Sequence, residues 1–492
     1  MSAPPPRRDA AASLTFQNLI DGRWQPASDG RTLEAVSPSD GKPFATMARG
    51  TAQDVDAAVR AARHAFEEGP WGRMSAVERG RLLMKLGQKI LEHFDELAEL
   101  EARDTGKPMK QARADITAAA RYFEFYGAGA DKVHGEVIPF LDGYMVTVLR
   151  EPKGVTGHII PWNYPAQMFG RTLAPALAMG NATVLKPAEE ACLTPVRLAQ
   201  LAMEVGFPPG AINLVTGIGE EAGAALSGHP GIDFLSFTGS PEVGTLVQIA
   251  AAKNHIGCVL ELGGKSPQIV FDDADLDAAL PVVTNAIVQN AGQTCSAGSR
   301  VLVQKSIYEG FLARVAERFA QLKVGSHVMD LDCGPLISAG QMKRVQGFLD
   351  RAAATGVPLI ARATVAPGAP EGGFYVAPAL FGPVPRSHEL ACDEVFGPVL
   401  SAIAFDDEAD GIRLANATEY GLVAGIWSRD GGRQMRAARA MRCGQVFVNG
   451  YGAGGGIELP FGGVKKSGHG REKGFEAMRE FSNSKTVVFK HG

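Results

Sequence analysis

The sequence predicts an α/β protein built from more than one domain. Short apolar or β-branched runs alternate with segments of helical periodicity, and hydrophobic residues make up 45% of the 492 residues. A chain of this length is about three times a typical domain and can bury a large core. A single small binding module is therefore excluded.

Two helices are expected before residue 110. Thr51 and Asp54 have the spacing of a capping box, and apolar residues follow them at helical intervals. Ser75 and Glu78 repeat this pattern before a longer apolar stripe, which Gly106 should end because glycine readily adopts the left-handed conformation of a helix C-terminus. We therefore expect one helix after Thr51 and a longer one from Ser75 to about Gly106.

From residue 151 onward the alternation is regular. Helical segments separate the runs GVTGHII, ATVLKP, INLVTG and IDFLSFTGS, which favours a parallel sheet of Rossmann type. After Gly263 the alternation resumes with SPQIVF, SRVLVQ, VLSAIAF and CGQVFVN, so a second α/β domain is predicted. Residues 137–150 and 485–490 indicate antiparallel strands that have no obvious place in either sheet.

Charge and composition exclude several classes of function. The net charge is −4, and no run of five or more like charges is present, so no nucleic-acid or membrane partner is expected. No apolar run reaches the roughly 18 residues of a membrane span, and no secretory signal is visible, so we expect a cytoplasmic protein. The six cysteines form no C-x-x-C pair, and no metal site is predicted.

Two glycine turns follow predicted strands. Gly219 belongs to a G-x-G-x-x-A pattern that opens a helix, which is the context of a dinucleotide-binding turn. Gly239, Ser240 and Gly244 form a second turn whose N–H groups would suit a pyrophosphate. Each turn alone is also compatible with an ordinary strand-to-helix connection. The sequence GGKS at 263–266 lacks the earlier glycine of a P-loop, so ATP binding there is rejected.

Three residues have the chemistry of a reactive site. Cys295 lies in a polar, glycine-flanked loop where N–H groups would stabilise a thiolate, although most cysteines are structural. Glu261 ends an apolar strand, where burial would raise its pKa toward that of a general base unless it is solvated or ion-paired. Asn163 follows a strand and can cap the next helix or donate its amide to an oxyanion. No histidine motif accompanies Cys295, which argues against a cysteine hydrolase.

The ordered motifs together resemble the aldehyde dehydrogenase superfamily. They are IIPWNYP, KPAE, FTGSPEVG, ELGGKSP, GQTC, EVFGP and PFGG. The resemblance runs from about Asn18 to the C-terminus. It implies oxidation of an aldehyde to the carboxylic acid with NAD, through a cysteine thiohemiacetal and thioester. Glu261 implies a hydrolytic, non-acylating member. A semialdehyde dehydrogenase that uses NADP, or an inactive scaffold of the same fold, is the alternative.

The resemblance also implies roles for individual residues. Cys295 would be the nucleophile, Glu261 the general base, and Asn163 with the Cys295 N–H the oxyanion hole. The cofactor-binding residues would be Ile159, Trp162, Lys186, Glu189, Gly219, Gly239, Ser240, Gly244, Leu262, Glu394 and Phe396. Glu189 would accept hydrogen bonds from the adenosine ribose and repel a 2′-phosphate, which favours NAD, while Lys186 leaves NADP open.

The substrate is expected to be an acidic or a bulky polar aldehyde. The substrate-lining residues would be Tyr164, Gln167, Arg171, Thr294, Ser296 and Phe461. Gln167 and Arg171 follow Asn163 at four-residue steps and would share one helix stripe. The succinate semialdehyde branch of the family has an arginine where Arg171 stands, but its second arginine is Gln289 here. Pairing of Arg171 with a neighbouring acid is the alternative. The glycine-rich loop 450–456 implies a wide mouth.

These assignments divide the chain into three folded parts. We expect a cofactor-binding domain at 13–130 and 151–261, a catalytic domain at 262–465, and a small β oligomerisation arm at 131–150 and 478–492. Residues 1–12 are expected to form a flexible tail. Unpaired strand edges need covering. In the proteins that this chain resembles, such strands join the sheet of a neighbouring subunit, and the resemblance therefore implies a homodimer or homotetramer.

Overall fold

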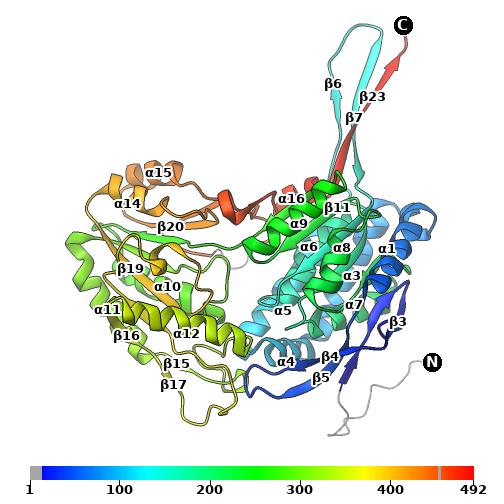
Figure 1. Ribbon diagram of the computed structural model, residues 1–492. Helices are drawn as coiled ribbons and strands as arrows, with labels where there is room; N and C mark the ends of the chain where they lie inside the picture. Colours follow the sequence, from blue (N-terminus) through cyan, green and yellow to red (C-terminus); the bar gives the residue numbers. More distant parts are fainter. Residues whose placement is uncertain (1–13, 453–455) are drawn as a thin grey trace.

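The computed structural model describes residues 14–452 and 456–492 and has two α/β lobes, with a slender arm that projects from one of them (Figure 1). Each lobe has its own hydrophobic core packed around a mainly parallel sheet. The predicted fold class, two α/β units with a β arm, is confirmed.

The first lobe contains an eight-stranded sheet. In spatial order its strands are β22 (Gly468–His469), β12 (Gly257–Glu261), β11 (Phe234–Thr238), β8 (Val155–Ile160), β9 (Ala182–Pro187), β10 (Ile212–Leu214), β2 (Asn18–Ile20) and β3 (Arg23–Gln25). The five strands from β12 to β10 are parallel. Chain order runs from β8 through β9 to β10 on one side and then resumes with β11 and β12 on the other. Such a reversal creates a crevice at the carboxyl ends of the strands, where α/β proteins bind ligands.

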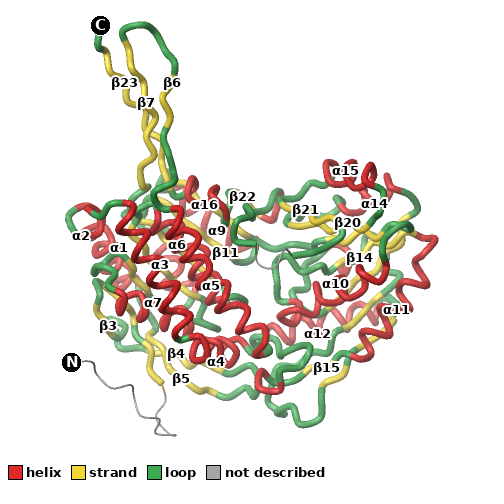
Figure 2. Tube along the Cα trace, turned by 180° about the vertical axis from the view of Figure 1, so that it is seen from behind, coloured by secondary structure: helices red, strands yellow, loops and turns green. Residues whose placement is uncertain are grey.

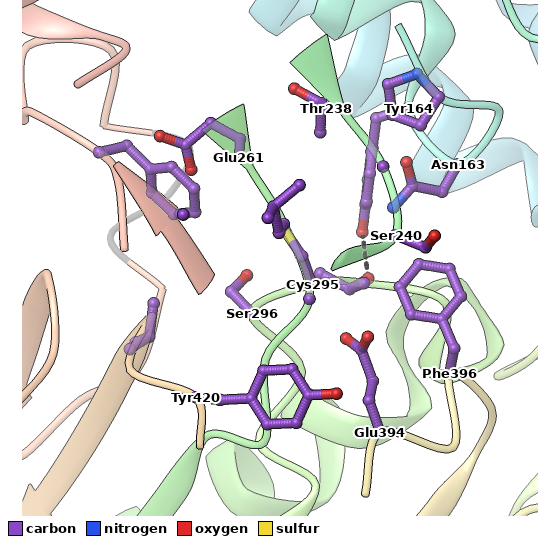
Figure 3. Close-up of a pocket in the computed structure, with 18 of the residues that line it drawn as sticks. Asn163, Tyr164, Thr238, Ser240, Glu261, Cys295, Ser296, Glu394, Phe396 and Tyr420 are labelled. Carbon is purple, nitrogen blue, oxygen red and sulfur yellow. Dashed lines mark hydrogen bonds between the residues drawn. The ribbon is translucent and has the colours of Figure 1, made fainter. Parts of the chain in front are cut away.

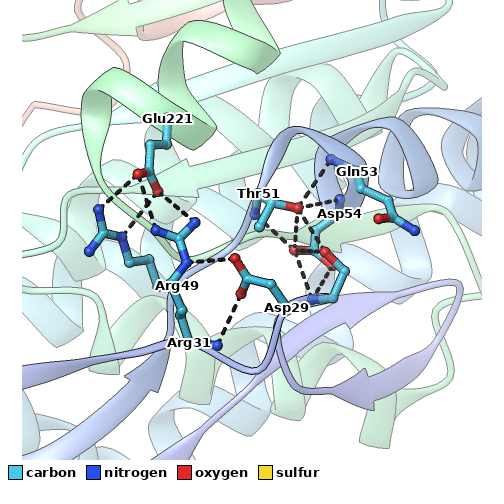
Figure 4. Close-up of polar contacts among 8 residues, drawn as sticks. Asp29, Arg31, Arg49, Thr51, Gln53, Asp54 and Glu221 are labelled. Atoms are coloured by element: carbon cyan, nitrogen blue, oxygen red, sulfur yellow. Dashed lines mark hydrogen bonds and ion pairs between the residues drawn. The ribbon is translucent and has the colours of Figure 1, made fainter.

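Helices of the first lobe begin where the sequence predicts. Thr51 and Asp54 form a capping box at α1 (Ala52–Glu67), and Figure 4 shows these contacts beside the ion pair between Arg49 and Glu221. Ser75 and Glu78 cap the helix α3 (Ala76–Glu92) in the same way. The remaining helices are α2 (Pro70–Arg73), α4 (Phe94–Thr105), α5 (Met109–Gly129), α6 (Pro165–Ala178), α7 (Leu193–Val205), α8 (Ala224–Ser227) and α9 (Pro241–Lys253).

The single long helix expected from Ser75 to about Gly106 is wrong. The chain breaks at His93, which ends α3 and precedes α4. Gly106 does end α4, with φ = 79°. Both helices pack against α5 and α7, and an apolar stripe alone does not reveal the change of direction between them.

The second lobe is built on a seven-stranded sheet. Its strands, in spatial order, are β16 (Leu359–Arg362), β18 (Ala379–Phe381), β19 (Val399–Phe405), β14 (Arg300–Gln304), β13 (Pro267–Val270), β20 (Val423–Trp427) and β21 (Gln445–Val448). All pairs are parallel except β16 with β18. Its helices are α10 (Leu276–Val288), α11 (Tyr308–Gln321), α12 (Ala339–Ala354), α13 (Glu389–Cys392), α14 (Glu408–Ala415) and α15 (Gly431–Ala440).

Three antiparallel strands make up the arm, as Figure 2 shows from behind: β6 (Glu136–Ile138), β7 (Tyr144–Pro152) and β23 (Ser482–Lys490). All nine residues of β23 pair with β7. The short helix α16 (Gly474–Glu480) connects the body of the molecule to β23.

Small sheets complete the fold. One contains β1 (Leu14–Phe16), β5 (Pro43–Ala48) and β4 (Thr32–Val36), and another pairs β15 (Lys323–Val324) with β17 (Thr364–Val365). No helix in the described part of the chain has the length and apolar character to span a bilayer.

Candidate active site

A cavity of about 1690 Å³ lies where the carboxyl ends of the first sheet face the loops of the second lobe. It is larger than a pocket for one drug-sized ligand, which is usually about 300–1,000 Å³, so it can hold two molecules side by side. Most of the predicted site residues line it: Trp162, Asn163, Tyr164, Gln167, Arg171, Gly239, Ser240, Glu261, Leu262, Thr294, Cys295, Ser296, Glu394, Phe396 and Phe461.

Cys295 lies at the centre of this cavity. Figure 3 shows its sulfur between Glu261 on one side and Glu394 with Phe396 on the other. The thiol packs against an apolar cluster that includes Leu422 and Phe461. Burial raises the pKa of Cys295 to about 12. The free thiol is therefore protonated at neutral pH, and its reaction as a thiolate requires loss of a proton within the cavity.

The loop that carries Cys295 has a special backbone. Asn290, Ala291 and Gly292 adopt positive φ values of 50°, 53° and 71°. Gly264 lies so close to this loop that a Cβ atom there would be 2.3 Å from the Cys295 carbonyl oxygen. Gly264, the second glycine of the ELGGK motif, is thus required by the close approach of the nucleophile loop, and the residues that follow form strand β13 rather than a P-loop helix.

Asn163 is fixed from several directions. Its backbone carbonyl oxygen accepts hydrogen bonds from Lys107 Nζ at 2.9 Å and from Asn290 Nδ2 at 3.0 Å. Its own Nδ2 donates to the Gln293 carbonyl at 2.9 Å. Since a primary amide carries two N–H donors, one donor remains for an oxyanion. Asn163 does not cap α6, because Tyr164 is the cap residue and no side chain bonds the first turn.

Glu261 ends β12 with its side chain buried in the cavity wall. Among the described residues neither of its carboxylate oxygens has a hydrogen-bond partner. Burial raises the pKa of Glu261 well above its usual range, and the positive charge of Arg171 partly opposes this shift. A carboxyl group with a raised pKa is suited to general base chemistry near neutral pH.

Arg171, on α6, is paired with acids. Its Nε lies 2.5 Å from Glu472 Oε2, and its Nη2 lies 3.7 Å from Glu261 Oε2. The guanidinium carbon also sits 4.4 Å from the centroid of the Phe461 ring. The pairing with a neighbouring acid, which the sequence left open, is therefore present, although Arg171 also lines the cavity as predicted.

Tyr164 and Gln167 are held by hydrogen bonds within the cavity wall. The Tyr164 hydroxyl and Thr294 Oγ1 lie 2.8 Å apart, and Figure 3 marks this contact. Gln289 Nε2 donates to the same hydroxyl at 3.2 Å. Gln167 Nε2 donates to Asp115 at 2.6 Å. Because these hydrogen bonds occupy their polar atoms, Tyr164 and Gln167 have fewer donors and acceptors left for a substrate.

Four of the predicted cofactor-binding residues lie along the same edge of the first sheet and are not part of the cavity lining: Ile159, Lys186, Glu189 and Gly219. Glu189 accepts hydrogen bonds from Lys186 Nζ at 2.6 Å and from the Gly219 N–H at 3.2 Å. Ile159 on β8 pairs with Lys186 on β9. Beyond β11, Ser240 caps α9 by accepting a hydrogen bond from the Val243 N–H. The polar groups thus form a row along the carboxyl ends of β10, β9, β8 and β11.

Glu394 closes the other end of the row. Its carboxylate accepts a hydrogen bond from the Gly264 N–H at 2.9 Å, and burial raises its pKa to about 7. A Cβ atom on Gly263 would lie 2.2 Å from this carboxylate. Phe396 packs edge-on against Trp162 with ring centroids 5.4 Å apart. Gly244 has a packing role, since a Cβ atom there would lie 2.6 Å from the Leu262 side chain.

Several residues of the site were not predicted from the sequence. Lys107, at the junction of α4 and α5, binds Asp115 at 2.5 Å and Glu101 at 3.3 Å behind Asn163. Lys473 lines the cavity beside Phe461, and Glu472 holds Arg171. These residues are remote from Cys295 in the sequence and carry no local signal. The predicted wide mouth rests partly on Gly454 and Gly455, which lie outside the described residues.

Comparison with known proteins identifies the family. Residues 24–487 match the Aldehyde dehydrogenase family, a span that includes all the predicted site residues. The chain belongs to the aldehyde dehydrogenase family. It is accordingly an NAD(P)-dependent enzyme that oxidises an aldehyde to the carboxylic acid.

Individual relatives of this family agree over nearly their whole length. Aldehyde dehydrogenase family 2 member B4, mitochondrial, from Arabidopsis thaliana is 41% identical over 478 residues, covering 96% of this chain and 88% of that one. A Burkholderia cenocepacia crystal structure assigned as an aldehyde dehydrogenase is 61% identical, with a TM-score of 0.96 and coverage of 97% and 100%. Betaine aldehyde dehydrogenase from Staphylococcus aureus, solved with NAD+, is 36% identical, with a TM-score of 0.95 and coverage of 97% and 95%.

Proposed function

We propose that this enzyme oxidises an acidic or bulky polar aldehyde with NAD, using Cys295 as nucleophile, Asn163 as oxyanion donor and Glu261 as general base. The observation that supports this most directly is the convergence of these three side chains on one cavity from the second lobe, the end of β8 and the end of β12. Each has the chemistry that its step requires.

The first step is addition of the Cys295 sulfur to the aldehyde carbon. The S–H bond of the thiol breaks and its proton passes to solvent water, a C–S bond forms, and the π electrons of the carbonyl move to its oxygen, which becomes an alkoxide. The free N–H of the Asn163 amide, together with the Cys295 N–H, would donate to this oxygen. One such donor typically lowers the barrier by about 3 kcal/mol. The carbonyl bonds from Lys107 and Asn290 keep Asn163 in place while the charge develops.

The row of polar groups from Gly219 to Glu394 fits a dinucleotide. Bound NAD supplies the acceptor for the hydride that leaves the thiohemiacetal. Ser240 and the α9 N-terminus would hold the pyrophosphate, and Glu394 with Phe396 the nicotinamide ribose. Lys186 already forms an ion pair with Glu189, so its charge is engaged by that carboxylate and is less able to attract a 2′-phosphate, which supports NAD over NADP.

Hydrolysis of the thioester completes the reaction. Glu261 would take a proton from water as the water oxygen attacks the acyl carbon and the Cys295 sulfur leaves. Because neither of its oxygens is hydrogen-bonded among the described residues, the Glu261 carboxylate is available to a water molecule.

An aldehyde panel with NAD and with NADP, followed by absorbance of the reduced nicotinamide, tests this proposal. We expect turnover with NAD and a lower kcat/KM with NADP. The Cys295→Ala variant should retain the wild-type circular dichroism spectrum and lose all turnover. Residual turnover in Cys295→Ala, or no turnover of any aldehyde by the wild type, would overturn the assignment.

A further inference from the structure

A small second cavity lies inside the second lobe. It is enclosed by the first residues of β14 and β20, the segment that enters β13, and the ends of α14 and α15. Its described lining includes three cationic residues, Lys265, Arg300 and Arg442, and no aspartate or glutamate. The space open to the centre of a water molecule is about 10 Å³, which is enough for one water molecule or one ion of similar size.

Lys265 is buried in the wall of this cavity. Only 1% of its surface is exposed, and among the described residues its Nζ has no hydrogen-bond partner. Glu394 and Asp393 act on it through their charge, and the Cys392 thiol also faces it, but burial and the charge of Arg300 prevail and lower the pKa of Lys265 to about 7. In its ammonium form Lys265 therefore offers three N–H donors that no described group accepts.

Arg300 brings a second positive charge to the same cavity. Its three guanidinium nitrogens donate to the backbone carbonyls of Lys265, Leu414 and Ala415 at 3.0, 3.0 and 2.9 Å. Each terminal nitrogen keeps one further N–H for another acceptor. Burial lowers the pKa of Arg300 to about 10, so the guanidinium remains charged at neutral pH.

Two buried cations without a carboxylate in the same lining are unfavourable unless one of them loses its proton or an anion binds beside them. An anion would give Lys265 the charge-assisted hydrogen bonds that burial in the protein denies it. The size of the cavity restricts that anion to a single small ion, because a carboxylate, sulfate or phosphate needs more room.

We propose that this cavity binds one halide ion through the Lys265 ammonium and the Arg300 guanidinium. The inference goes beyond the proposed function, since no lining residue of this cavity has a role in aldehyde oxidation. The site nevertheless adjoins the active site. Gly264, the neighbour of Lys265 in the chain, donates its N–H to Glu394 and lies against the Cys295 carbonyl oxygen.

Anomalous X-ray scattering from chlorine tests the location of the ion. Crystals of the full chain are grown with sodium chloride or with sodium gluconate and measured at long wavelength, where chlorine scatters anomalously and water does not. We expect an anomalous peak in contact with Lys265 Nζ in the chloride crystals and none there in the gluconate crystals. Chloride crystals without this peak would overturn the inference.

The line width of the chloride NMR signal gives a second readout in solution. The affinity is obtained from titrations at constant ionic strength, with gluconate as the balancing anion, for the wild type, Lys265→Met and Lys305→Met. Lys265→Met should weaken chloride binding ten- to a hundredfold, because it removes one charge-assisted hydrogen-bond donor. Lys305→Met, a surface control whose lysine pairs with Asp406, should bind chloride as the wild type does.

The pH dependence distinguishes the ammonium from the cavity shape. Lys265 is charged below its pKa, so chloride affinity of the wild type should be constant at low pH and fall as the pH rises through about 7. Bound chloride favours the ammonium, so the fall should move to higher pH as the chloride concentration increases.

Equal chloride affinities in the wild type and in a folded Lys265→Met variant would also overturn the inference. If circular dichroism shows that this variant does not fold, the anomalous peak and the pH dependence of the wild type decide the matter. Turnover of aldehydes with NAD tests the proposed function separately, and neither result depends on the other.

Discussion

At the scale of single residues, burial in the cavity opposes the charged forms of both the nucleophile and the base. Burial raises the pKa of Cys295 to about 12 and that of Glu261 well above its usual range. Arg171 supplies the positive charge that moves both values back toward the ionised forms. The reactive state of the site therefore depends on this arginine, whose Nη2 lies 3.7 Å from Glu261 Oε2.

Glu261→Gln should separate the two halves of the reaction. The thioester can still form, but its water lacks a base, so a burst of about one NADH per active site followed by slow turnover is expected in a stopped-flow trace. In the wild type, deacylation should accelerate as the pH rises through the raised pKa of Glu261, because only the carboxylate accepts a proton. The glutamine variant should lack this rise. Loss of the burst would assign Glu261 to acylation instead.

Arg171→Leu should damage the enzyme without regard to substrate charge. The change leaves Glu472 buried without its cation, and removing one partner of a buried ion pair typically costs about 3–5 kcal/mol. Urea denaturation should show this loss in the free energy of unfolding, and kcat/KM should fall equally for acidic and neutral aldehydes. A loss restricted to acidic aldehydes would show that Arg171 itself binds the substrate carboxylate.

At the scale of elements, the junction between α4 and α5 supports the oxyanion hole. Gly106 ends α4 in the left-handed conformation, and the next residue, Lys107, turns inward to Asn163, Glu101 and Asp115. Lys107 is buried, and its cation also lies 4.5 Å from the centroid of the Tyr164 ring. The lysine that follows the C-terminus of α4 thus holds the backbone of Asn163 in place.

Lys107→Met should lower both stability and kcat. It leaves two buried carboxyl groups without their cation and removes a donor to the Asn163 carbonyl. The double variant Lys107→Met with Asp115→Asn should recover part of the stability, as measured by thermal unfolding, while kcat stays low because Asn163 still lacks its donor. If kcat recovers together with stability, Lys107 has only a structural role.

Local sequence patterns predicted the elements well and the contacts between distant elements poorly. The capping boxes at Thr51 and Ser75 and the strand-to-helix alternation after residue 151 act within a few residues, so the sequence displays them directly. Lys473 and Lys107 depend on packing between segments far apart in the chain, and neither lies in a recognisable local motif. The break at His93 has the same cause, because tertiary packing decides where an apolar stripe changes direction.

At the scale of the whole molecule, the arm exposes apolar side chains that no other part of the described chain covers. Val137, Phe140, Leu141, Val488 and Phe489 expose 73%, 62%, 64%, 54% and 48% of their surface. Exposed apolar strands usually belong to an interface.

We predict a homodimer or homotetramer. Light scattering at micromolar concentration should report a mass of at least two chains, and replacing Val488 and Phe489 with lysine should shift it toward one chain. The control replaces Val328, an exposed residue of the second lobe, with lysine. A monomeric wild type would contradict the prediction.

The helix α16 connects the wall of the cavity to the arm. Lys473 stands at one end of this seven-residue helix and β23 begins at Ser482 just beyond the other, a separation of about 10 Å along a rigid rod. In the predicted oligomer, a neighbouring subunit that pairs with β23 would thereby also restrain Lys473 in the cavity wall. By mass action, dilution of the enzyme should release that restraint. We therefore expect specific activities measured at nanomolar and micromolar enzyme to differ.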